Sequence, residues 1–69
     1  MKFKVALIGF GYWGPKLARN IQNSNYFQID YIVDISQKNI DSAKKAFPLS
    51  KVISDYKKIN NQKIDLVVI

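Results

Sequence analysis

Apolar and polar residues follow two different spacings along this chain, and each spacing predicts a type of element. Residues 2–8 end in an apolar run without alternation, which is typical of a strand covered on both faces of a parallel sheet. Residues 26–34 are rich in aromatic and β-branched side chains, which favour a second strand. Between them, residues 13–23 carry small and apolar side chains at the spacing of one helix face: Gly14, Leu17, Ala18 and Ile21.

A second helix follows the second predicted strand. Ser36 offers a side-chain oxygen that caps a helix, and the charge order, with Asp41 early and lysines late, complements the helix dipole. Pro48 removes a backbone donor and restricts the residue before it, so we expect the helix to end near Ala46. Its predicted buried face consists of Ile40, Ala43 and Phe47.

Two short strands complete the pattern, at residues 50–54 and 64–69, separated by a polar segment that allows at most one helical turn. Strands that alternate with helices through short connections predict an α/β fold with a parallel sheet. Right-handed crossovers then place the first strand centrally, in the strand order 3-2-1-4. We therefore predict the first half of a doubly wound sheet, without repeats or linkers.

The stretch "GFGYWG" between the first strand and the first helix matches the pattern G-x-G-x-x-G. Gly9 permits a tight turn, Gly11 lets the backbone approach a pyrophosphate, and Gly14 lets the helix pack closely on the strand. An anion at this place meets unpaired N–H groups and the positive end of the helix dipole. The alternative is a glycine turn that only reverses the chain, but the strand and helix on either side favour a Rossmann-type dinucleotide site.

Asp34 ends the second predicted strand, about twenty residues after Gly14, where dinucleotide folds place an acid that binds the adenosine ribose hydroxyls. The alternative role is a helix cap or a loop aspartate. An acid at this position also repels a 2′-phosphate, which favours NAD over NADP. Lys38 follows nearby, and we interpret it as a solvated helix residue.

The composition mainly excludes classes of function. The 69 residues carry a formal net charge of +6, but no lysine run is longer than two residues, which indicates a solvated surface rather than a nucleic-acid interface. The chain has no cysteine and no histidine, so we expect no disulfide and no metal site. No apolar run has membrane-spanning length and no signal cleavage site is evident, so we expect a cytoplasmic protein without a membrane partner.

Aromatic residues raise one further alternative, a stacking platform for single-stranded nucleic acid. We instead attribute them to core packing and to the covering of loops: Tyr12, Trp13, Tyr26, Phe27 and Tyr31. The remaining carboxylates lie at predicted element ends and form no acid/base pair by their spacing: Asp30, Asp41, Asp55 and Asp65.

Four stretches resemble the Gfo/Idh/MocA oxidoreductases: "KVALIGFGYWGPKLARNI", "YIVDIS", "SDYKKI" and "IDLVVI". The "GYWGP" variant is similar to members that act as nucleotide-sugar 3-dehydrogenases. The resemblance implies an N-terminal Rossmann domain that binds NAD(P), followed by an α/β substrate domain. Residues 1–69 would be the N-terminal part of the first domain, with its remainder and the substrate domain absent. The family's catalytic lysine lies in a Glu-Lys-Pro motif that has no match here, so the catalytic residues are unknown.

The same resemblance assigns the glycines, the backbone of Tyr12 and Trp13, and Asp34 to the cofactor. With the adjacent Phe10 and Ile35, the candidate cofactor-binding residues are Gly9, Phe10, Gly11, Tyr12, Trp13, Gly14, Asp34 and Ile35. The implied function is hydride transfer between a sugar or nucleotide-sugar carbon and nicotinamide. The alternative is a non-catalytic nucleotide-binding or protein-interaction module. The apolar residues 64–69 also predict self-association, because an uncovered edge strand is a template for pairing.

Overall fold

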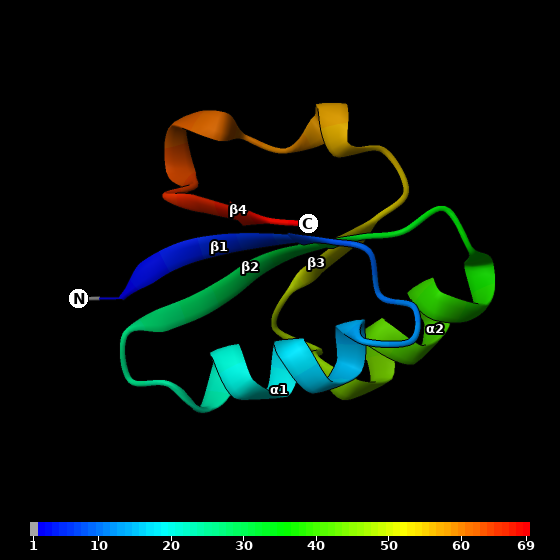
Figure 1. Cartoon of the computed structure of the whole chain (residues 1–69). Helices are drawn as coiled ribbons and strands as arrows, with labels where there is room; N and C mark the ends of the chain where they lie inside the picture. Colours follow the sequence, from blue (N-terminus) through cyan, green and yellow to red (C-terminus); the bar gives the residue numbers. More distant parts are fainter. Residues whose placement is uncertain (1) are drawn as a thin grey trace.

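The computed structural model describes residues 2–69 as one four-stranded parallel sheet with two α-helices (Figure 1). The strand order is β3-β2-β1-β4, which confirms the predicted α/β class and order. All three strand pairs are parallel. The elements in chain order are β1 (Phe3–Ile8), α1 (Gly14–Asn23), β2 (Phe27–Val33), α2 (Gln37–Ala46), β3 (Lys51–Ile53), the 3-10 turns η1 (Tyr56–Lys58) and η2 (Asn61–Lys63), and β4 (Leu66–Val68).

Both α-helices lie on one face of the sheet (Figure 1). Their buried small residues, Ala18 and Ala43, let the helices approach the strands closely. Leu7 and Ile32 from the two central strands are almost wholly buried beneath them. The core on this face consists of Leu7, Phe10, Ala18, Ile29, Ile32, Ala43 and Phe47. The predicted buried face of α2 is thus confirmed, since Ile40, Ala43 and Phe47 are all buried.

The opposite face is covered by residues 54–65, which connect β3 to β4 (Figure 1). Ile59 is the buried anchor of this segment and packs with Ala6 and Val33. Asp65 then aligns β4, because its side chain accepts the N–H of Lys4 at 2.8 Å and its own N–H donates to the Lys4 carbonyl at 2.9 Å. The segment contains two 3-10 turns, so the expectation of at most one turn was wrong. β4 is also shorter than predicted.

Some predicted side-chain environments were wrong. Leu17 was predicted to lie on the buried face of α1, but its side chain is exposed. Of the two roles expected for the aromatic residues, core packing does not apply to Tyr12, Trp13 and Tyr26, which are exposed. Phe10 is the aromatic residue of the turn that enters the core, where its ring meets Phe47 edge-on at a centroid distance of 5.9 Å.

Helix ends follow local chemistry. Ser36 caps α2 as predicted, with its hydroxyl accepting the N–H of Asn39 at 3.4 Å. Across residues 2–69 the helices are all too short or too polar to cross a membrane. Within the same residues, no cluster of three or more metal-binding side chains is present.

Candidate functional site

The glycine turn lies at the carboxyl end of the central strand β1, between β1 and α1 (Figure 1). The two neighbours of β1 are reached over opposite faces of the sheet. β2 follows through α1 on one face, and β4 follows through residues 54–65 on the other. Open parallel sheets bind ligands at the carboxyl ends of strands where the connections diverge in this way. The turn therefore stands at the place where this architecture forms binding sites.

The three glycines of the turn meet different structural demands. Gly9 has a φ of +100°, a backbone conformation that side chains with a Cβ rarely adopt. A Cβ on Gly14 would lie 3.0 Å from the Gly9 carbonyl oxygen, so α1 packs onto the turn at a distance only glycine allows without a shift. At Gly11 a Cβ would meet nothing within 4 Å, and the backbone has no left-handed angle. The fold thus requires glycine at positions 9 and 14 but not at 11.

The backbone after Phe10 carries several N–H groups that the fold leaves without a partner within residues 2–69. α1 begins at Gly14, its N-cap residue Trp13 makes no side-chain cap, and its first turn contains no acidic residue. Pro15 lacks an N–H, and Leu17 is the first residue to bond back into the helix, to the Trp13 carbonyl at 3.0 Å. Within residues 2–69, the N–H groups of Gly11, Tyr12, Trp13 and Gly14 donate to no other group. Such donors at a positive helix end attract an anion.

Asp34 stands beside this turn and bonds to it directly. Its Oδ2 accepts the N–H of Phe10 at 2.7 Å and the side-chain amide of Asn39 at 3.1 Å. Its Oδ1 accepts the N–H of Ser36 at 2.8 Å. The carboxylate therefore ties the turn after β1 to the start of α2. The contact between Asn39 and Asp34 was not predicted. The sequence signal for it is an amide side chain three residues after the Ser36 cap.

The hydrogen bonds also fix the charge of Asp34. Burial raises the pKa of the Asp34 carboxyl, but the bonds from Ser36 and Phe10, with that from Asn39, outweigh it and hold the pKa below its ordinary value of 3.8. Asp34 is thus an anion at neutral pH. A carboxylate offers about four lone-pair positions, and the Asp34 carboxylate interacts with the donors of Phe10, Ser36 and Asn39 and with the backbone N–H of Ile35.

The remaining predicted residues surround these groups. Ile35 follows Asp34 and is 92% exposed, an apolar side chain in water next to a carboxylate. Tyr12 and Trp13 project from the turn at 86% and 68% exposure, with their rings edge-to-face at 5.2 Å. Phe10 differs, because its side chain is buried and its N–H is occupied by Asp34. Phe10 therefore helps to hold the turn in place.

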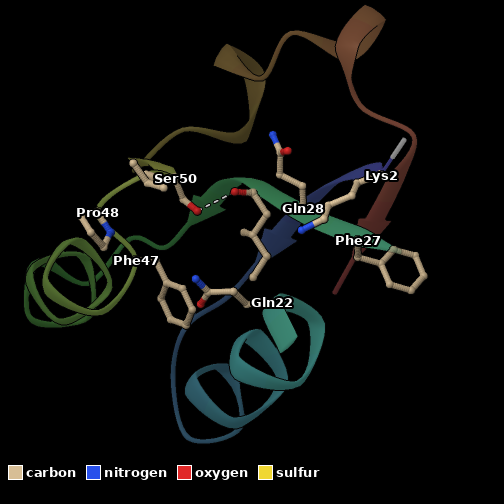
Figure 2. Close-up of a pocket in the computed structure, with 9 residues that line it drawn as sticks. Lys2, Gln22, Phe27, Gln28, Phe47, Pro48 and Ser50 are labelled. Atoms are coloured by element: carbon tan, nitrogen blue, oxygen red, sulfur yellow. Dashed lines mark hydrogen bonds between the residues drawn. The ribbon is translucent and has the colours of Figure 1, made fainter. Parts of the chain in front are cut away.

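A separate hollow of about 400 Å³ lies at the other end of the strands (Figure 2). Phe27, at the start of β2, and Phe47 line it together with Lys2 and Gln22. Ser50 closes one side by donating its hydroxyl to the Ile29 carbonyl at 2.6 Å. The hollow includes none of the predicted site residues, and it faces the amino ends of β2 and β3, away from the edge where parallel sheets bind ligands.

Comparison with protein families identifies the class to which this site belongs. The model of the GFO_IDH_MocA family, described as an oxidoreductase family with an NAD-binding Rossmann fold, matches residues 3–69. The chain therefore belongs to this oxidoreductase family and constitutes an NAD-binding Rossmann region. Comparison with curated proteins and with solved structures gave no match.

The bonds of Asp34 generate a prediction about stability. Asp34→Asn keeps the side-chain shape but removes one acceptor oxygen, leaving a backbone N–H without its partner. We expect the free energy of unfolding to fall by about 1–3 kcal/mol at neutral pH. Urea denaturation followed by circular dichroism measures this loss. The control is Asp41→Asn, since within residues 2–69 the Asp41 carboxylate accepts one hydrogen bond, from the exposed Gln37 side chain.

The pH dependence has a definite sign. Because the folded-state pKa of Asp34 is lowered, its stabilisation is complete above the unfolded-state pKa near 3.8 and is lost as the pH falls through the lower folded-state value. In Asp34→Asn, the part of the acid-induced loss of stability that comes from protonation of Asp34 should be absent. A variant with the stability and pH profile of Asp41→Asn would contradict the bridging role of Asp34.

Proposed function

We propose that residues 1–69 bind the adenosine and pyrophosphate parts of NAD within an enzyme that oxidises a sugar or a nucleotide sugar. The observation that carries this proposal is Gly11, whose missing side chain serves neither the backbone angle nor internal packing. Glycine at such a position leaves room for a group from outside the chain to approach the backbone.

The neighbouring residues have fitting roles. The pyrophosphate would accept hydrogen bonds from the N–H groups of Gly11, Tyr12 and Trp13, which have no partner within residues 2–69 and lie where the α1 dipole is positive. The Asp34 carboxylate, at the end of β2, would accept a ribose hydroxyl. Ile35 offers an exposed apolar surface beside it for the adenine base. Gly9, Phe10 and Gly14 would act indirectly, by holding the turn in shape.

Nicotinamide, when bound, supplies the hydride acceptor, and this part of the chain supplies binding and orientation. We place the catalytic lysine and the sugar-binding domain outside residues 1–69, because the Glu-Lys-Pro motif of the resembled family is absent from the sequence. The "GYWGP" stretch supports a nucleotide sugar as the substrate class.

We expect the chain to prefer NAD(H) to NADP(H). Asp34 is charged at neutral pH, and a 2′-phosphate on the ribose would bring a second negative group close to it. The repulsion should weaken NADPH binding by about tenfold, equivalent to ~1.4 kcal/mol. Isothermal titration calorimetry with both cofactors measures the difference. Equal or tighter binding of NADPH would refute the assignment of Asp34 to the ribose.

Gly11→Val tests the pyrophosphate site itself. A valine side chain would occupy the space that the phosphates need, while inside the fold it meets nothing. We expect loss of NADH binding, with a circular dichroism spectrum and unfolding midpoint close to those of the parent. Ser42→Val is the control, because Ser42 is exposed on α2. Parent-like NADH affinity in Gly11→Val would show that the glycines only form a turn.

A specific observation also favours a protein-interaction role. β4 is an edge strand that pairs only with β1, and Val67 in it is 51% exposed. Val67 also lines a hollow of about 550 Å³ on the sheet face with Ile8, Ile59 and Ile69. We propose that the 69-residue chain self-associates through this strand, because an apolar edge is a template for pairing.

For self-association, we expect the sedimentation coefficient of the parent chain to rise with concentration. Val67→Lys should keep the chain monomeric, because a charge on an edge strand opposes pairing. Leu49→Lys is the control, since Leu49 is exposed away from β4. A parent that stays monomeric at high concentration and unfolds cooperatively would refute this interface and indicate a self-sufficient folded unit.

A further inference from the structure

The turn carries a feature that the binding roles above do not use. Trp13 and Tyr12 stand side by side on the surface, and the Nζ of Lys16 lies 5.7 Å from the centre of the Trp13 ring. Lys16 belongs to the first turn of α1 and is itself exposed. The Tyr12–Trp13–Lys16 cluster thus places one cation and two aromatic rings in the segment whose backbone N–H groups have no partner within residues 2–69.

The position of Lys16 is electrostatically unusual. A helix N-terminus is positive and favours acidic residues, yet the first turn of α1 has no acid and one lysine. The cation gains only weak compensation from the exposed Trp13 ring, because cation–π contacts at the surface contribute little. A lysine here adds to the positive potential of the helix end. That arrangement becomes favourable when an anion occupies the site.

The position of Trp13 points the same way. Its side chain is two-thirds exposed and has no part in the core. Its ring lies against the Tyr12 ring and near the Lys16 ammonium. These contacts restrict where the long lysine side chain extends. Trp13 therefore acts on the site by limiting the positions of the Lys16 charge.

We propose that Lys16 binds the pyrophosphate of the dinucleotide and that Trp13 is the positioning residue that holds its ammonium group at the turn. This inference rests on the proposed function, because it names additional groups of the same site. In this arrangement the phosphate charge is met from two directions, by the backbone N–H groups and by a side-chain cation. Tyr12 supports Trp13 through the edge-to-face contact.

Trp13 is the only tryptophan of the chain, so its fluorescence reports directly on the cluster. NADH is the probe, since its reduced nicotinamide accepts energy from excited tryptophan. We expect saturable quenching of the parent on titration with NADH. The measurement works at low protein concentration, where self-association is least. Calorimetry with NADH gives the affinity independently of the fluorophore, which the Trp13 variants require.

Four variants separate the roles. Lys16→Gln should lower NADH affinity at least roughly tenfold and flatten its dependence on salt, because one charge-assisted contact is lost. Trp13→Ala should lower affinity as well, and Trp13→Phe should restore most of it, since phenylalanine also presents a ring face to the lysine. Lys44→Gln, in the last turn of α2, is the matched control and should bind as the parent does.

The outcomes distinguish this inference from the proposed function. If the parent binds NADH and Lys16→Gln matches Lys44→Gln in affinity and salt dependence, the role of Lys16 is overturned while the proposed function stands. If Lys16→Gln weakens binding but Trp13→Ala does not, the positioning role of Trp13 is overturned. If the folded parent shows no NADH binding by either method, the proposed function fails and this inference fails with it.

Discussion

The hydrogen bond from the Phe10 N–H to the Asp34 carboxylate, at 2.7 Å, is the contact on which the organisation of the site depends. It joins the turn after the central strand to the residue that ends the neighbouring strand. The adjacent bond from the Gly9 N–H to the Val33 carbonyl, also 2.7 Å, extends the pairing of β1 and β2 into the turn. With both bonds made, the start of the turn is fixed to the end of β2, and the N–H groups of Gly11 to Gly14 have no partner within residues 2–69.

One carboxylate thus serves structure and electrostatics together. The bonds that hold Asp34 in place also keep it ionised, because they stabilise the charged form. An ionised group at this edge of the sheet places a negative charge a short distance from the positive end of α1. In the function we propose, the ribose hydroxyls of a dinucleotide would meet this carboxylate and its phosphates would meet the N–H groups of the turn.

Much of this arrangement was predictable because it depends on local patterns. The spacing of small residues in α1 and the Ser36 cap predicted the helices, and the succession of strands with right-handed crossovers was sufficient for the strand order 3-2-1-4. The aromatic residues were not predictable in the same way. Phe10 is buried, whereas Tyr12 and Trp13 are exposed, although all three lie in one short turn. All three side chains are aromatic, so the sequence gives no reason to bury one and expose the others. The path of the backbone through the turn decides which ring reaches the core. The environment of Leu17, at the edge of the predicted face of α1, depended on the helix orientation in the same manner.

By itself, the sequence determined the class of fold and the three glycines, because periodicity and the absence of a Cβ are properties of single residues and their neighbours. The tertiary structure alone decided what each glycine is for. Gly9 is required by its φ of +100° and Gly14 by an approach of 3.0 Å, whereas Gly11 faces open space. The tertiary structure also decided that Asp34 bonds to the turn, since that contact joins residues 24 positions apart. Distances between distant residues arise only when the sheet is assembled, and the function of this site depends on those distances.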